Sequence, residues 1–339
     1  MLKLRTSLII FFIYCLILPN SSLPQEKNIE VKINELISKM TLKEKIGQLS
    51  QYAAGMNPTL EMIKNGGIGS MLSVRGAENT NPLQKAAVEQ SRLGIPIIFG
   101  YDVIHGLNTT FPIPLAWASS WDTALIKESA KVAAMEAALN GIKWTFAPMV
   151  DITRDPRWGR IAEAAGEDPF LGSAISGALV RGFQGDSLND WLSVAACSKH
   201  YAAYGAAEAG KEYNTTDISE RTLRELYLPP HKAAVDAGVS TVMSAFNSLN
   251  GIPASANYHT LTEILKNEWG FKGFVVSDWN SVGELVSHGV AADKKEAALK
   301  GFTAGVDMDM IGDSTVGDIY PSNLPPLVSE GKISRGRID

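Results

Sequence analysis

Short apolar segments alternate along the chain with longer segments of helical periodicity. Apolar residues recur every three or four positions in the longer segments, and three of these segments stop at a glycine. We therefore predict helices over residues 29–53, 123–140, 220–237 and 261–269. Residues 327–337 predict a helix and its polar exit, and 337–339 predict the start of another helix. The apolar segments are short, lack polar alternation and carry β-branched or aromatic residues, which predicts buried strands. These strands cover residues 68–74, 95–101, 145–152, 194–199, 241–246, 274–277 and 306–311.

Strands separated by helices predict a parallel sheet, because parallel neighbours need crossover connections. Strands that do not alternate indicate a sheet that is buried on both faces. Seven or eight such units in one domain favour an α/β fold of the (β/α)8 TIM type over an open sheet. The chain has 339 residues, 45% of them hydrophobic, which suffices for one barrel of about 250 residues or for two smaller domains. We assign residues 29–339 to the barrel domain.

Residues 1–22 predict a secretory signal peptide. Lys3 and Arg5 precede an apolar run over residues 8–18, and the small polar segment 19–22 follows. The run is too short to span a bilayer comfortably. We therefore expect a periplasmic or secreted protein with no stable membrane insertion after the signal is removed.

Composition and motifs argue against several classes of function. The net charge of -5 gives no reason to expect nucleic acid as a partner. The five His residues form no pair with metal-ligand spacing, and no glycine-rich phosphate loop is present, so we expect neither a metal nor another cofactor. Cys197 is the only cysteine outside the signal peptide, which excludes an internal disulfide and predicts a small core residue.

Polar residues accumulate where the predicted strands end. In chain order they are Asp102, His105, Asp151, Arg154, Arg157, Arg160, Lys199, His200, Asn247, Asp278 and Trp279, with Asp309 inside the last strand. Each has a structural explanation when taken singly: Asp278 could cap the next helix, and Arg160 could pair with Glu163 or Glu167. Charged groups at buried strand ends are costly unless paired. Their recurrence at one end of successive strands predicts an active site at the carboxyl ends of the barrel.

The mixture of groups indicates the chemistry of the ligand. Carboxylates accept hydrogen bonds from sugar hydroxyls, whereas Lys, Arg and His donate to them, and Trp stacks on the sugar ring. We therefore predict a neutral polyhydroxyl ligand.

Several motifs carry a resemblance to a known family. They are residues 101–106, 146–151, 154–160, 166–168, 198–205, 211–215 and 273–279. In this order they resemble glycoside hydrolase family 3, most closely its periplasmic β-glucosidases, from about Ile33 to Asp339.

The resemblance implies a retaining exo-acting β-glucosidase that hydrolyses terminal non-reducing β-D-glucosyl residues. Its substrate would be a β-glucoside or a short β-glucan oligosaccharide. Asp278 would be the nucleophile that forms a covalent glycosyl-enzyme. The residues implied to hold the sugar are Asp102, Arg160, Lys199 and His200, with Met243 and Trp279 as apolar walls. Phe246 stands where relatives often have Tyr, which removes a hydroxyl near the nucleophile.

A retaining mechanism needs a second carboxyl group about 5–5.5 Å from the nucleophile. In two-domain members of the family, the acid/base Glu comes from an α/β sandwich domain after the barrel, and we expect this sequence to be truncated before it. The single-domain β-N-acetylhexosaminidases use a loop His instead, which segment 201–205 lacks. Glu208, Glu212 and Glu220 remain open as substitutes for the acid/base Glu. Since acid catalysis contributes about 10²–10⁴-fold, we expect the isolated fragment to be weak or inactive.

Two alternatives remain open. One is a β-xylosidase or another exo-β-glycosidase of the same family, and the other is a non-catalytic sugar-binding module that keeps the pocket. Covalent labelling of Asp278 by a 2-fluoroglycoside separates an enzyme from a binding module.

Overall fold

The computed structural model describes residues 24–56, 59–311 and 318–339, so the predicted signal peptide lies outside the described residues. The chain divides into two compact units at Thr41. The described part of the first unit contains helix α2 (Pro24–Lys39). Among the described residues, no helix is both long enough and apolar enough to cross a membrane.

The second unit contains a closed barrel of parallel strands. The described chain supplies eight of them: β1 (Ser50–Ala53), β2 (Ser70–Leu72), β3 (Ile98–Tyr101), β4 (Trp144–Thr145), β5 (Cys197–Tyr201), β6 (Thr241–Ser244), β9 (Phe274–Ser277) and β10 (Asp309–Met310). Hydrogen bonds join them in the orders β10-β1-β2-β3-β4 and β5-β6-β9. Single parallel bridges, Trp144 to Ala195 and Val276 to Met308, complete the circle. The predicted (β/α)8 barrel is therefore confirmed.

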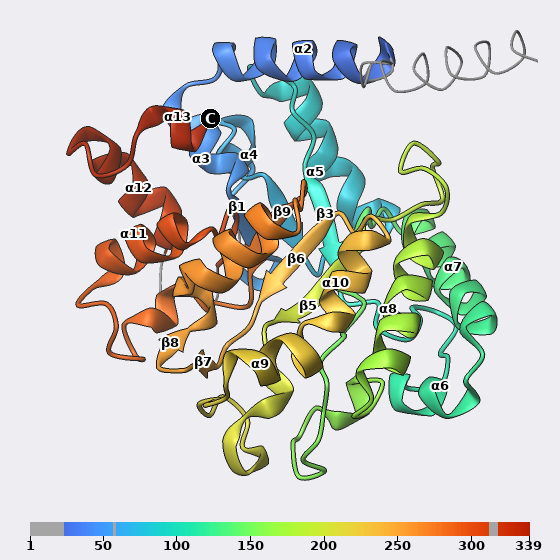
Figure 1. Ribbon diagram of the computed structural model, residues 1–339. Helices are drawn as coiled ribbons and strands as arrows, with labels where there is room; N and C mark the ends of the chain where they lie inside the picture. The colour runs from blue at the N-terminus through green and yellow to red at the C-terminus, as the bar shows by residue number, and fades with distance from the viewer. Residues whose placement is uncertain (1–23, 57–58, 312–317) are drawn as a thin grey trace, which may run out of the picture. The chain divides into compact units, whose positions relative to one another are not determined.

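Helices follow the strands and pack around the sheet. The α-helices of this unit are α3 (Leu42–Gln48), α4 (Leu60–Lys64), α5 (Ala77–Gln90), α6 (Pro114–Ser120), α7 (Thr123–Leu139), α8 (Pro169–Gln184), α9 (Glu220–Thr222), α10 (Pro229–Asp236), α11 (Lys294–Ala304), α12 (Ile319–Ser329) and α13 (Arg335–Ile338). Helix α8 packs between α7 and α10, and α11 packs beside α12 (Figure 1). Asp122 and Asp168 begin α7 and α8 by accepting hydrogen bonds from backbone N–H groups of the first turn.

Two segments are π-helical, η5 (Leu223–Tyr227) and η7 (His259–Glu268). Short turns and a hairpin fill the connections: η1 (Ala54–Met56), η2 (Ile161–Glu163), η3 (Tyr204–Ala206), η4 (Glu208–Gly210), η6 (Ala254–Ala256), η8 (Gly283–Leu285), β7 (Ser248–Leu249) and β8 (Ile252–Pro253). The predicted helix over 220–237 is interrupted at Leu228, because the two prolines that follow it lack N–H donors. Helices at 123–140 and 261–269 were predicted correctly, and the structure shows that the second is a π-helix.

Each predicted strand overlaps an observed strand, but the prediction of a helix over residues 29–53 is wrong at its end. Helix α3 stops at Gln48, and the four residues of β1 (Ser50–Ala53) are all buried between β10 and β2. Strand β1 is short and lacks alternation, so its pattern merges with that of the helix before it. It supplies the eighth strand and closes the barrel.

The predicted helix and its polar exit over 327–337 are observed, although the helix begins earlier, at Ile319. Helix α12 ends at Ser329, and α13 begins only at Arg335. Gly331 has a φ of 72°, a left-handed conformation that ends helices and that glycine adopts without strain.

Side chains fill the interior of the barrel. One buried cluster draws members from nearly every strand: Ala53, Leu72, Trp144, Phe146, Cys197, Met243, Val276, Met308 and Met310. Cys197 is buried and free, so the prediction of a core cysteine is confirmed, and burial raises the pKa of its thiol to about 12. Because the interior is packed, any ligand must bind at an end of the barrel.

Candidate active site

Four ionisable side chains from three strands meet at the carboxyl ends of β3, β5 and β9. Asp102 follows β3, Lys199 and His200 lie in β5, and Asp278 follows β9. The Nζ atom of Lys199 donates to Oδ1 of Asp102 over 2.6 Å. The Nε2 atom of His200 lies 3.4 Å from Oδ2 of Asp278. The strand-end pattern therefore predicted correctly that these side chains lie together, while their roles toward a sugar stay predictions.

The Asp278 carboxylate is mostly enclosed, with a side chain that is 12% exposed. Its Oδ1 atom accepts the backbone N–H of Trp279 over 2.6 Å, whereas its Oδ2 atom is buried and has no hydrogen-bond donor among the described residues. Burial raises the pKa of Asp278 to about 6, and the charges of Lys199 and Arg160 together with the Trp279 N–H act in the opposite direction. Oδ2 is therefore a carboxylate oxygen with free lone pairs beside two cations.

Asp151 holds His200 from the side opposite Asp278. Its Oδ2 atom accepts the backbone N–H of His200 over 3.0 Å and lies 2.8 Å from the ring Nδ1 atom. Burial lowers the pKa of His200 well below 6.5 and raises the pKa of Asp151 to about 7, so the imidazole is neutral and has one N–H. Because Oδ2 of Asp278 has no donor, we assign this proton to Nδ1. Nε2 then offers a lone pair to the site.

Arg160 lies in the connection between β4 and α8. It forms a forked ion pair with Glu163, with N···O distances of 2.8 and 2.9 Å, so the structural pairing considered from sequence exists. Its guanidinium carbon also lies 5.7 Å from the centre of the Tyr204 ring. Burial lowers its pKa, but Glu163 and nearby carboxylates raise it by more, so Arg160 stays charged.

The apolar side chains of the predicted site differ in exposure. Met243 belongs to the buried interior cluster, whereas Trp279 is 40% exposed at the carboxyl end of β9. Phe246 packs against Tyr213 with ring centres 4.6 Å apart, and against Tyr204 at 5.8 Å. Met243 thus lies beneath the site, while the aromatic rings lie at its level.

Four residues near these groups were not assigned to the sugar site from the sequence, although Asp151 was named among the strand-end residues and Glu212 was left open as the acid/base. They are Asp151, Tyr204, Glu212 and Glu284. Asp151 had the same signal as Asp278, a carboxylate at the end of an apolar strand, and could have been included. Tyr204 and Glu212 lie in the loop after β5, where no periodic pattern marks them. Glu284 lies in a turn after β9, and burial together with the charge of Asp278 raises its pKa to about 7.

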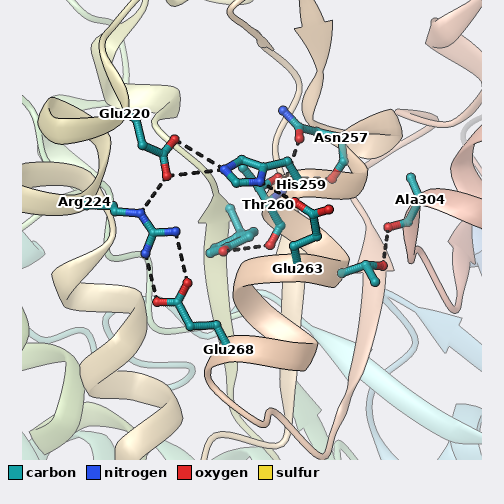
Figure 2. A network of polar contacts seen from close by, with 10 residues as sticks. Glu220, Arg224, Asn257, His259, Thr260, Glu263, Glu268 and Ala304 are labelled. Carbon is teal, nitrogen blue, oxygen red and sulfur yellow. Dashed lines mark hydrogen bonds and ion pairs between the residues drawn. The ribbon is translucent and has the colours of Figure 1, made fainter.

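The three carboxylates left open as acid/base substitutes have different environments. Glu212 accepts a hydrogen bond from Tyr204, and Glu208 is exposed. Glu220 pairs with Arg224 in an exposed network on the outer helices, as Figure 2 shows. Within the described part of the chain, none of the three forms a hydrogen bond or ion pair with Asp278. The same part contains no group of three or more His, Cys, Asp or Glu side chains that could hold a metal ion.

Comparison with known proteins identifies relatives of this chain. A beta-glucosidase from Listeria innocua, solved in complex with isofagomine, matches the fold with a TM-score of 0.85 and 44% identity, over 91% of this chain and 44% of that one. The periplasmic beta-glucosidase of Salmonella typhimurium is 44% identical over 91% of this chain and 40% of its own length. A beta-xylosidase of Formosa agariphila is 37% identical, over 88% of this chain and 39% of its own.

The chain thus spans about two fifths of the length of these curated relatives. The family model described as the glycosyl hydrolase family 3 N terminal domain matches residues 41–339, which covers the whole barrel. The chain therefore belongs to glycosyl hydrolase family 3.

Proposed function

We propose that this chain carries the sugar-binding and nucleophilic part of a retaining exo-β-glucosidase, with Asp278 as the nucleophile. The observation that carries the proposal is the Oδ2 atom of Asp278, which is buried, without a hydrogen-bond donor among the described residues, and beside His200. Its lone pairs are free to attack an anomeric carbon. The 44% identity to a beta-glucosidase supports the same assignment.

The reaction would proceed by formation of a bond between Asp278 Oδ2 and the anomeric carbon while the bond to the leaving oxygen breaks. Asp102, Arg160, Lys199 and His200 would hold the sugar hydroxyls, with Met243 and Trp279 as apolar walls. The positive charge that develops on the sugar ring in the transition state would be offset by the Asp278 carboxylate. Because the carboxylate form is the nucleophile, activity should rise with pH through the raised pKa of about 6.

The second carboxyl group is part of the proposal. The resemblance to the family implies an acid/base Glu on an α/β sandwich domain, and the 339 residues span about two fifths of the length of the curated relatives. Without this Glu, the 339-residue chain should hydrolyse only glycosides whose leaving groups need little protonation.

A β-xylosidase is the second candidate, favoured by the 37% identity to a protein of that name. A xyloside differs from a glucoside by lacking the hydroxymethyl group at C5. Parallel assays with the two aryl glycosides distinguish these substrates.

We further propose β-glucosides or short β-glucan oligosaccharides as substrates, and export to the periplasm or beyond. The substrate class is supported by beta-glucosidases among the relatives, one of them solved in complex with glucose. Export is supported by the predicted signal peptide over residues 1–22 and by the identity to a protein named periplasmic.

The test is covalent labelling of the 339-residue chain with a 2-fluoroglucoside that has an activated leaving group. Mass spectrometry should find one glucosyl adduct on Asp278. Asp278→Asn should abolish labelling, and Asp186→Asn, at an exposed position, should leave the rate unchanged. Glucose affinity of all three proteins is measured by calorimetry.

Two results would contradict the proposal. If the wild type binds glucose but forms no adduct, the chain is a sugar-binding module. If the adduct forms on another residue, Asp278 is not the nucleophile.

A further inference from the structure

Tyr204 lies against two of the groups assigned to the sugar site. Its ring meets the His200 ring edge-on, with centres 5.3 Å apart and planes at 74°. The guanidinium carbon of Arg160 lies 5.7 Å from the centre of the same ring. Contacts of both kinds are directional and depend on the position of the ring. A shift of the Tyr204 ring would therefore displace both His200 and Arg160.

The hydroxyl of Tyr204 donates a hydrogen bond to Oε1 of Glu212. Burial raises the pKa of Tyr204 far above its usual value, and the bond to Glu212 adds to the rise, so the phenol stays a donor. The second oxygen of Glu212, Oε2, is buried and has no hydrogen-bond partner in the described part of the chain. The bond from Tyr204 is therefore the one side-chain hydrogen bond that the described residues supply to the carboxyl group of Glu212.

The other sides of the Tyr204 ring are enclosed by aromatic rings. Trp158 meets it edge-on at 5.3 Å, and Phe246 and Tyr213 approach to 5.8 and 6.4 Å. Gly205 lets the loop pass close to the backbone of Ile152, since a Cβ atom at this position would lie 2.3 Å from the carbonyl oxygen of Ile152. The aromatic rings limit the position of Tyr204 sideways, and the bond to Glu212 fixes its hydroxyl end.

We propose that Glu212 is a positioning residue that acts through Tyr204 on His200 and Arg160. The catalytic consequence rests on the proposed function, because His200 and Arg160 are assigned there to the sugar. Glu212 belongs to the loop after η4 (Glu208–Gly210), so this loop controls the geometry of a site that lies at the end of β5. A purely structural role for the aromatic cluster predicts instead that the Tyr204 hydroxyl can be removed without effect on His200.

The proposal is tested with three variants of the full chain. Tyr204→Phe removes only the hydroxyl, Glu212→Ala removes the acceptor, and Glu212→Gln keeps an acceptor oxygen. Tyr258→Phe and Asp217→Ala are matched controls, since both side chains are exposed and have no hydrogen bond among the described contacts.

The first measurement is the ¹⁵N NMR spectrum of the His200 ring, assigned with His200→Gln. Tyr204→Phe and Glu212→Ala should shift or broaden these signals, Glu212→Gln should restore them, and the controls should leave them unchanged. This readout needs no catalytic activity. It therefore separates failure of the positioning role from failure of the proposed function.

The second measurement is the rate of covalent labelling by the 2-fluoroglucoside. Tyr204→Phe and Glu212→Ala should each slow it by about 10- to 100-fold, the cost of misplaced binding groups. The double variant should be no slower than either single variant, because both remove the same interaction. Unchanged His200 signals, or additive effects in the double variant, would overturn the inference. If the signals respond but the wild type is not labelled, the proposed function has failed and the positioning role stands.

Discussion

His200 at the end of the barrel and His259 on the outer helices each lie between two carboxylates. Figure 2 shows the surroundings of His259. His200 Nδ1 is 2.8 Å from Asp151, and His259 Nδ1 is 2.6 Å from Glu263. Each Nε2 atom faces a second carboxylate, at 3.4 and 3.3 Å. The His200 side chain is 1% exposed and that of His259 is 46% exposed. Burial lowers the pKa of His200, whereas the bond to Glu263 raises the pKa of His259.

The difference teaches that two neighbouring carboxylates do not by themselves decide the charge of a histidine, because burial can outweigh them. Water solvates an imidazolium on the outer helices, so carboxylates there favour the charged form. In the barrel the loss of water, together with the positive charges of Arg160 and Lys199, outweighs the carboxylates. An uncharged His200 beside the buried carboxylate of Asp278 is a costly arrangement, and such perturbed groups are typical of functional sites.

The largest effect on stability is expected when the two carboxylates that contact Nδ1 of the histidines, Asp151 and Glu263, are each replaced by Ala. Asp151→Ala should leave two buried N–H donors of His200 unpaired, at about 1–3 kcal/mol each, so the free energy of unfolding should fall by about 2–6 kcal/mol. Glu263→Ala removes an exposed pair and should cost less than about 1 kcal/mol. Urea unfolding at pH 7, followed by circular dichroism, measures both. Equal losses of unfolding free energy in the two variants would show that burial does not distinguish the two histidine–carboxylate pairs.

A second comparison uses two arginines with forked carboxylate partners. Arg160 pairs with Glu163, and Arg224 pairs with Glu268 over 2.8 and 3.0 Å. Arg160→Met should weaken glucose binding by about 10- to 100-fold, since a charged hydrogen bond contributes about 1.5–3 kcal/mol. Arg224→Met should leave glucose affinity unchanged. Calorimetric titration with glucose measures the affinity of both variants. An unchanged glucose affinity in Arg160→Met would show that Arg160 does not bind the sugar.

The strand-end residues could be predicted because a buried strand leaves a strong local pattern. Apolar runs that end in Asp102, Lys199 or Asp278 indicate both the strand and the end at which its polar group lies. Because the strands are parallel, their carboxyl ends lie at the same end of the barrel, so this prediction does not depend on the path of the loops. Asp151 had the same pattern and was counted among the strand-end residues, but it was not assigned to the sugar site.

The loop residues could not be predicted in this way. Tyr204 and Glu212 meet because η3, η4 and the segment after them fold back on β5, and no periodicity encodes that path. Strand β1 (Ser50–Ala53) was missed for a related reason, since its burial depends on pairing with β10 far along the chain. Contacts between distant segments decide both cases, and they leave no mark in a local window of sequence.

The smallest expected effect is the pH dependence of the two histidines. The pKa of His259 is raised in the folded chain, so its contribution to stability is complete below 6.5 and is lost as pH rises through the folded pKa. The pKa of His200 is lowered, so its contribution is lost as pH falls below 6.5, where the unfolded chain takes up a proton. NMR titration should therefore show His259 titrating above 6.5 and His200 remaining neutral throughout the range from about 5 to 8. His259→Gln should remove only the small loss of stability on the alkaline side, because its partners are exposed and screened. A His200 that titrates near 6.5 would mean that water reaches the ring, and the contrast between the two histidines would then rest on their neighbours after all.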